Sequence, residues 1–265
     1  MASIVKPTLV LLPGAWHLAS TLAGFVEELK ARGYPAEAHT LRSVGNAAAT
    51  VADDVLHIRS ILLSHIEQGK DVILIVHSFA GYGGSEAIEG LHKRTRAAKG
   101  EVGGLVGGIW LAAFMPPQPD LPPREWIKLD VSRLAIYTIP NGTLTIRQAK
   151  AGLLHVSNAV DIFYGDCDVN TAKECEKILQ GHSLLACSRP KVKRGWADAA
   201  WEGSRGYILC LQDKAIEEAV QRDMINRSEV RWNVKAMNSS HTPFLSVPVK
   251  TADVVEELII EFYKA

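Results

Sequence analysis

Three residues of types that together can carry out acyl transfer follow separate predicted strands of this 265-residue chain. Ser78 comes one residue after an apolar run, Asp213 lies near the end of another, and His241 stands on a loop after a third. Taken singly, they could be a helix cap, a turn residue and a surface histidine. Taken together, they predict Ser78 as nucleophile, His241 as its base and Asp213 as the acid that orients the base.

The segment around Ser78 predicts a sharp strand-to-helix turn. Residues 72–76 form a short β-branched strand, and a helix is predicted from Phe79 to Lys93. In such a turn the serine hydroxyl is exposed, and small residues are expected two positions before and after it. Val76 and Ala80 occupy those positions here, so the segment departs from Gly-x-Ser-x-Gly.

A second loop at the same edge supplies the candidate oxyanion hole. Pro13-Gly14-Ala15-Trp16 follows the first predicted strand. An oxyanion needs two preorganised N–H donors, and we predict those of Ala15 and Phe79. The structural alternative for Pro13-Gly14 is an ordinary tight turn, and both interpretations can hold at once.

The elements that must position these residues alternate between strand and helix. This alternation predicts a doubly wound, mostly parallel α/β sheet with right-handed connections. The predicted strands are 9–12, 36–40, 72–76, 105–113, 207–211 and 230–236, and the predicted helices are 20–32, 50–67, 79–93, 216–225 and 251–263.

One long insertion interrupts the alternation. We predict a helical lid over residues 116–193, inserted in a core formed by 1–115 and 194–265. Within it, Asn141-Gly142 predicts a small hairpin, and helices are expected at 146–156 and 170–179. The candidate pocket-wall residues are aromatic side chains and one histidine, although each could equally be core: Trp16, Trp126, His155, Phe163 and Tyr164.

The amino-acid composition limits the classes of partner that this chain is expected to bind. Lysine plus arginine and aspartate plus glutamate are 29 each, which argues against nucleic acid and anionic membrane as partners. No apolar run reaches the length of a transmembrane helix. Four cysteines without metal spacing fit a reducing compartment, so a cytoplasmic location is expected. We expect no metal site; a homodimer is left open.

With these residues placed, the chain resembles the α/β-hydrolase superfamily over nearly its full length. Within it, the chain is similar to small fungal and bacterial serine hydrolases akin to plant methyl-ester esterases and hydroxynitrile lyases. The resemblance is carried by three segments: Leu12-Pro13-Gly14-Ala15-Trp16-His17, His77-Ser78-Phe79-Ala80-Gly81 and Ser240-His241-Thr242-Pro243-Phe244. Leu111–Pro116 and Phe163–Asp166 support it.

The resemblance implies a cofactor-free enzyme that acts on an ester, lactone or related carbonyl, with the same triad and oxyanion donors. The aromatic candidate pocket residues and the balanced charge favour a small, largely apolar substrate. Hydroxynitrile lyases of this group carry a lysine directly after the histidine, where Thr242 stands here, so lyase activity is disfavoured. Carbon–carbon bond hydrolysis of a β-diketone uses the same triad and stays open. So does a small-molecule receptor of this fold with slow turnover.

Overall fold

Six parallel strands form the central sheet of the computed structural model, which describes residues 6–115, 136–139, 142–148, 151–187 and 192–265. Their order across the sheet is β10-β9-β4-β3-β1-β2. The bounds are β1 Thr8–Leu12, β2 Ala36–Ala38, β3 Asp71–His77, β4 Gly104–Leu111, β9 Arg205–Cys210 and β10 Asn233–Met237. The predicted doubly wound α/β core is confirmed.

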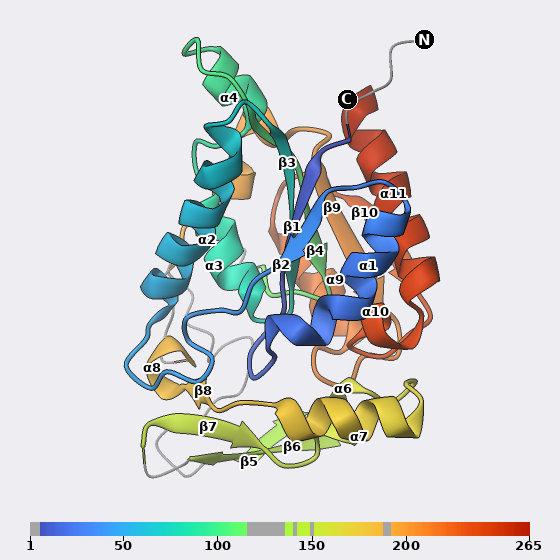
Figure 1. Ribbon diagram of the computed structural model, residues 1–265. Coiled ribbons are helices and arrows are strands. Elements are labelled where there is room, and N and C mark those ends of the chain that lie inside the picture. Colours follow the sequence, from blue (N-terminus) through green and yellow to red (C-terminus); the bar gives the residue numbers. More distant parts are fainter. Residues whose placement is uncertain (1–5, 116–135, 140–141, 149–150, 188–191) are drawn as a thin grey trace.

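Helices cover both faces of this sheet (Figure 1). On one face lie α1 (Ala23–Ala31, after a 3-10 turn at Ala19–Leu22) and α11 (Pro248–Lys264), and on the other α2 (Val51–Ile66) and α3 (Ala80–Ala87). The remaining core helices are α4 (Lys93–Ala97), α9 (Glu218–Arg227) and α10 (Pro243–Ser246), with 3-10 turns at Gly195–Ala197 and Ala199–Trp201. No helix in the described ranges is long and apolar enough to cross a membrane.

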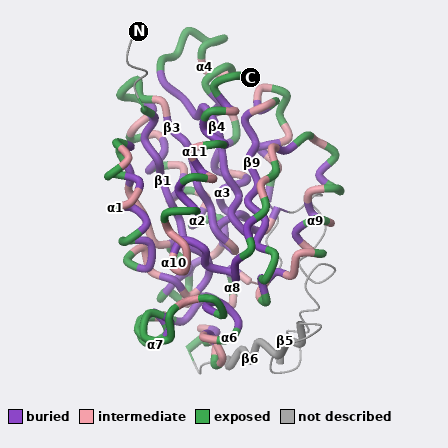
Figure 2. The backbone as a smooth tube through the Cα atoms, turned by 90° about the vertical axis from the view of Figure 1, so that its right-hand side faces the viewer, coloured by how far each residue is buried: buried purple, intermediate pink, exposed green. Residues whose placement is uncertain are grey.

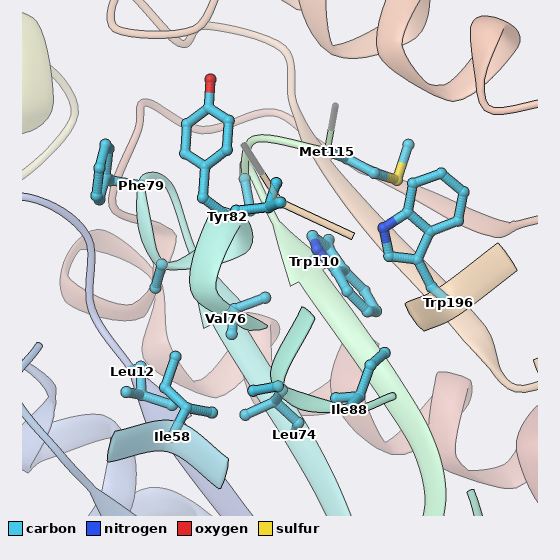
Figure 3. Packing of buried hydrophobic residues seen from close by; sticks show 14 of the residues in the cluster. Leu12, Ile58, Leu74, Val76, Phe79, Tyr82, Ile88, Trp110, Met115 and Trp196 are labelled. Atoms are coloured by element: carbon cyan, nitrogen blue, oxygen red, sulfur yellow. The ribbon is translucent and has the colours of Figure 1, made fainter. Parts of the chain in front are cut away.

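The two apolar layers follow from the two-residue period of the strands. Val10 and Leu12 of β1 pack with α2 and α3, whereas Leu9 and Leu11 pack with α1 and α11. Both faces are therefore buried, as Figure 2 shows for the central strands, and a continuous apolar run is the expected sequence pattern. Figure 3 shows side chains of the first layer, among them Val76, Trp110 and Trp196.

Some predicted boundaries were too long. The strand predicted to reach residue 113 ends at Leu111, because Ala112 adopts a φ of 41° that no strand continues. The helix predicted over 79–93 ends at Ala87, and Gly90, at a φ of 71°, turns the chain before α4.

The inserted segment contains a second, four-stranded sheet of order β5-β6-β7-β8 (Figure 1). Its strands are β5 Ile136–Ile139, β6 Gly142–Gln148, β7 Leu153–Val156 and β8 His182–Ser183, and its helices are α6 Ala159–Phe163, α7 Val169–Ile178 and α8 Leu184–Cys187. We call this unit the lid. It lies across the end of the core opposite the chain termini.

The lid is thus a mixed unit and not the helical one predicted. The hairpin at 141–142 is confirmed by the pairing of Ile139 with Gly142, and α7 matches the predicted helix 170–179. The helix predicted over 146–156 is wrong, since Ile146 pairs with Val156 in an antiparallel hairpin. Gly152, at a φ of 76°, allows a turn that the helical spacing of the apolar residues did not reveal.

Candidate active site

Ser78 occupies a strained turn between β3 and α3. Its φ is 53°, a left-handed conformation that is unfavourable for a residue with a Cβ. The turn is held from both sides, because Ser78 donates its N–H to Leu111 O (3.3 Å) and its carbonyl accepts from Phe114 N–H (3.0 Å). The end of β4 therefore fixes the serine, which is half-buried in an otherwise buried segment.

Two glycines near the start of α3 make room for the side chains that depart from the usual motif. A Cβ on Gly84 would lie 2.7 Å from Val76 Cγ1, so the absence of a side chain there accommodates the valine. A Cβ on Gly81 would lie 2.1 Å from Phe114 O. The helix therefore approaches the chain after β4 most closely at residue 81, and the side chain of Ala80 is tolerated. The usual motif has its glycines two residues before and after the serine. Here Gly81 and Gly84 provide the space that those glycines would provide, so the serine turn keeps its geometry.

Asp213 and His241 form a buried pair beside this turn. Asp213 Oδ2 lies 2.7 Å from His241 Nδ1, and their side chains are 0% and 1% exposed. Because a carboxylate only accepts, Nδ1 carries the proton and Nε2 is left as the acceptor. Among the hydrogen bonds of the described residues, none joins Ser78 Oγ to His241 Nε2; the contact with His241 is made by His77, the residue before Ser78 in the chain.

His77 and Gln221 hold this pair and were not predicted to do so. His77 Nε2 donates to His241 O (2.9 Å), and the two rings lie 4.5 Å apart. Burial lowers the pKa of His77 well below its usual value, so this histidine stays neutral. Gln221, wholly buried in α9, donates Nε2–H to Asp213 Oδ2 (3.2 Å) and to Ile216 O (2.6 Å).

The loop after β1 lies directly against Ser78. A Cβ on Gly14 would lie 2.6 Å from Ser78 Cβ and 3.0 Å from its Oγ, so only glycine fits. In the part of the chain that the structure describes, no acceptor takes a hydrogen bond from the N–H of Ala15 or of Phe79. Both predicted donors therefore flank the serine with their N–H groups available.

Backbone strain is concentrated at this edge of the sheet. Four non-glycine residues in the described ranges have a positive φ: Trp16 (66°), Ser78 (53°), Ala112 (41°) and Glu229 (60°). The first three follow the carboxyl ends of β1, β3 and β4, which are neighbours in the sheet. Strain of this kind is retained where the surrounding structure imposes it, and it often marks functional sites.

Two predicted pocket residues, Trp16 and Phe163, lie over the site. The Phe163 ring is 5.6 Å from the His241 ring and stacks on Trp16 at 5.7 Å. Trp16 is half-buried and donates Nε1–H to Leu154 O in the lid (2.9 Å). These rings place an apolar surface next to the proposed base.

The other predicted pocket residues behave differently. Tyr164 is buried, and its hydroxyl bonds to His17 Nε2 (2.8 Å), so it contacts the loop after β1 instead of lining a pocket. His155 is exposed on β7, with its ring against Gly181, and the structure does not bring it to Ser78. Trp126 lies outside the described residues.

The loop that carries His241 is fastened to the lid. Thr242 Oγ1 donates to Phe163 O (2.8 Å), and Ser240 Oγ donates to the same carbonyl (3.2 Å) and to Asp166. Asp166 also accepts from Ser246 Oγ (3.0 Å). The segment 163–166, which supported the family resemblance, thus anchors the histidine loop.

No three His, Cys, Asp or Glu side chains within the described ranges come together as a metal site.

Comparison with known proteins agrees with this architecture. The alpha/beta hydrolase family matches residues 9–254, and the chain belongs to that family. It is 26% identical over 252 residues to the alpha/beta hydrolase nvfD of Aspergillus novofumigatus, covering 92% of this chain and 93% of that protein. It is 23% identical over 220 residues to methylesterase 1 of Arabidopsis thaliana, covering 76% and 74%.

Solved structures show the same fold. A pyrethroid hydrolase from Sphingobium faniae superposes with a TM-score of 0.72 at 21% identity, over 98% of this chain and 100% of that one.

Proposed function

We propose that this protein is a serine esterase that cleaves a carboxylic ester or lactone of a small, largely apolar molecule through an acyl-enzyme. The observation that supports this most is the buried Asp213–His241 pair beside a serine held at a φ of 53°. Relatives include proteins named methylesterases, which favours ester hydrolysis over other reactions of the fold.

In the proposed mechanism His241 Nε2 takes the proton of Ser78 Oγ as the oxygen attacks the substrate carbonyl. The oxyanion that forms receives hydrogen bonds from the N–H groups of Ala15 and Phe79. Asp213 stabilises the imidazolium, which then protonates the leaving alkoxide. Water, deprotonated by His241, hydrolyses the acyl-enzyme and releases the acid.

Two measurements test this proposal together. A panel of 4-nitrophenyl esters and lactones of increasing chain length is assayed with the wild-type protein and with Ser78→Ala. We expect turnover by the wild type and a loss of about 10⁴-fold or more in kcat in the variant, since a triad member is removed. A fluorophosphonate should label Ser78, as seen by peptide mass. Retained turnover in the variant, or labelling elsewhere, contradicts the assignment.

A further inference from the structure

The lid contacts the oxyanion loop, which we define as residues 13–17, at several points. Gln180 N–H donates to Trp16 O (2.9 Å), and Trp16 Nε1–H donates to Leu154 O (2.9 Å). The third bond joins Tyr164, at the end of α6, to His17. A short loop held by three hydrogen bonds from another unit takes its conformation partly from that unit.

The His17–Tyr164 bond has a defined direction. His17 Nδ1 lies 2.7 Å from Ala15 O, a group that can only accept, so Nδ1 carries the proton. Nε2 is then an acceptor, and Tyr164 donates its hydroxyl to it at 2.8 Å. Burial lowers the pKa of His17 to about 4, so the neutral ring that this arrangement needs persists at neutral pH.

His17 fixes two consecutive peptide planes of the loop. Its backbone N–H donates to Gly14 O (3.4 Å), and its ring donates to Ala15 O. The Gly14 carbonyl and the Ala15 N–H belong to one planar peptide unit and point in opposite directions. The backbone bond holds the Gly14 carbonyl toward His17 and so turns the Ala15 N–H away from it, while the ring bond to Ala15 O holds the peptide plane that follows. Ala15 is therefore fixed between two restrained planes, and the second restraint depends on the His17 side chain.

We propose that His17 and Tyr164 are positioning residues for the oxyanion hole: Tyr164 of the lid orients the His17 ring, and His17 orients the Ala15 N–H. This inference rests on the proposed function. It makes the oxyanion donor depend on contact between the lid and the core.

Removal of the Tyr164 hydroxyl tests the inference. In Tyr164→Phe the His17 ring keeps its place but loses the bond that orients it. We expect kcat on a 4-nitrophenyl ester to fall about 10-fold, less than the 10²–10³-fold known for deleting an oxyanion donor outright. KM should change less than twofold, because the ground-state carbonyl depends little on the hole.

A double-mutant cycle separates a shared contact from two independent ones. The shorter amide of His17→Asn can still donate to Ala15 O but cannot reach Tyr164, so this variant should lose about as much kcat as Tyr164→Phe. The double variant should lose no more than either single one, since both remove the same bond. If the loss of kcat in the double variant equals the product of the two single losses, the inference is wrong.

Affinity for an oxyanion analogue distinguishes positioning from general structural damage. A trifluoromethyl ketone forms a hemiketal oxyanion on the serine, whereas the matching methyl ketone binds mainly in the ground state. Across the variants, affinity for the first should fall in proportion to kcat/KM and affinity for the second should not. Tyr34→Phe, a buried tyrosine among the residues that pack on α1 and α11, is the matched control and should leave both affinities unchanged.

The outcomes separate the two proposals. If the wild type shows Ser78-dependent turnover while Tyr164→Phe and His17→Asn keep kcat and analogue affinity within twofold, the positioning role is wrong and the esterase stands. Absence of Ser78-dependent turnover in the wild type would remove the proposed function and the positioning role with it. If His17→Asn does not fold, Tyr164→Phe alone decides the positioning role.

Discussion

Asp213 uses its two carboxylate oxygens for different tasks. Oδ1 accepts the N–H groups of Ala215 (2.7 Å) and Ile216 (2.9 Å), while Oδ2 faces His241 and Gln221. Four hydrogen bonds, two to each oxygen, hold the carboxylate in one orientation. The tautomer of His241 is therefore set by a residue that the start of α9 and the loop before it hold in place.

Asp213→Asn should abolish most activity without unfolding the protein. The amide oxygen is expected to stay with the two backbone N–H groups, which turns the NH₂ group toward His241 Nδ1. Nδ1 must then accept, the ring proton moves to Nε2, and His241 can no longer take the serine proton. We expect kcat to fall about 10³–10⁴-fold, as in other serine hydrolases with this change.

The measurement is steady-state kinetics on the best ester of the panel, with thermal unfolding as the check on folding. Asp161→Asn is the neighbouring control, because Asp161 pairs with Lys214 at the surface (2.6 Å) and should leave kcat unchanged. A kcat within tenfold of wild type in Asp213→Asn would show that His241 does not depend on this carboxylate.

Residue types and chain order were enough to predict the pair Asp213–His241, because strand ends that share a sheet edge must bring their loops together. Gln221 could not be found this way. Its amide reaches Asp213 only through the path of the loop between β9 and α9, and a glutamine within a helix carries no signal of its own. Tyr164 was predicted as a pocket wall because aromatic type alone does not distinguish lining from anchoring.

At the scale of elements, α3 can approach the sheet only through its glycines. Gly81 faces Phe114 O and Gly84 faces Val76, and each would clash through an added Cβ. Gly84 lets a bulky valine stand where the serine turn usually needs a small residue. The sequence showed these small residues early in the helix, but their partners appear only in the structure.

Gly81→Ala should destabilise the protein and distort the serine turn. The new Cβ would lie 2.1 Å from a backbone oxygen that cannot move independently, because the neighbouring Phe114 N–H holds Ser78 O. Overpacking of this kind costs about 1–3 kcal/mol in the free energy of unfolding. Denaturant unfolding measures that loss, and kcat should fall with it.

Gly24→Ala is the matched control in a helix of the opposite face. Gly24 lies in the first turn of α1, and a Cβ there meets nothing within 4 Å. Replacing it should stabilise the protein by up to about 1 kcal/mol through helix propensity. If both variants lose the same free energy, the clash at Gly81 does not control its cost.

All six core strands were predicted, four of them from short apolar runs (9–12, 72–76, 105–113 and 207–211) and the two edge strands, β2 and β10, without such a run. The lid was harder, since residues 146–156 carry apolar spacing that fits a helix or a short hairpin equally well. This segment forms strands because β7 pairs with β6 and also with β8, which lies some 30 residues further along the chain. Local periodicity does not reveal pairing over that distance.

At the scale of the whole molecule, the protein buries several neutral histidines. Burial lowers the pKa of His17 and of His92 to about 4 and that of His182 to about 3, and it lowers the pKa of His77 as well. His182 of the lid is wholly buried against Phe79 (4.6 Å between rings), and neither ring nitrogen has a hydrogen-bond partner among the residues that the structure describes. These rings lie in the lid, at the active site and at the start of α4. Their protonation therefore affects the free energy of unfolding of the whole molecule.

One buried carboxyl, that of Asp54, has the opposite effect on the pH dependence of the free energy of unfolding. Asp54 in α2 accepts from Ser43 N–H (3.0 Å) and Ser43 Oγ (2.6 Å), but burial dominates and raises its pKa from 3.8 to about 6. Between pH 6 and 3.8 the folded state therefore binds the additional proton. As the pH falls through this window, Asp54 adds stability, whereas the histidines remove it.

These four buried histidines oppose the carboxyl of Asp54, so we expect the histidines to determine how the free energy of unfolding changes with pH. Each has an unfolded pKa near 6.5, so between pH 6.5 and about 4 the unfolded chain holds protons that the folded chain lacks. The free energy of unfolding is therefore highest above pH 6.5 and should fall as the pH drops toward 4. Each histidine contributes up to about 1.4 kcal/mol per pH unit inside its window.

Two variants with opposite expected effects test this balance. In His92→Asn the new side chain can still accept from Arg94 N–H at the start of α4 but cannot titrate, so the slope of unfolding free energy against pH between 6 and 5 should flatten. Asp54→Asn can keep both bonds to Ser43 and removes the opposing group, so the slope should steepen. Urea unfolding at pH 7, 6 and 5 measures both slopes. Parallel changes in the two variants would mean that desolvation of these groups does not control the acid stability of the fold.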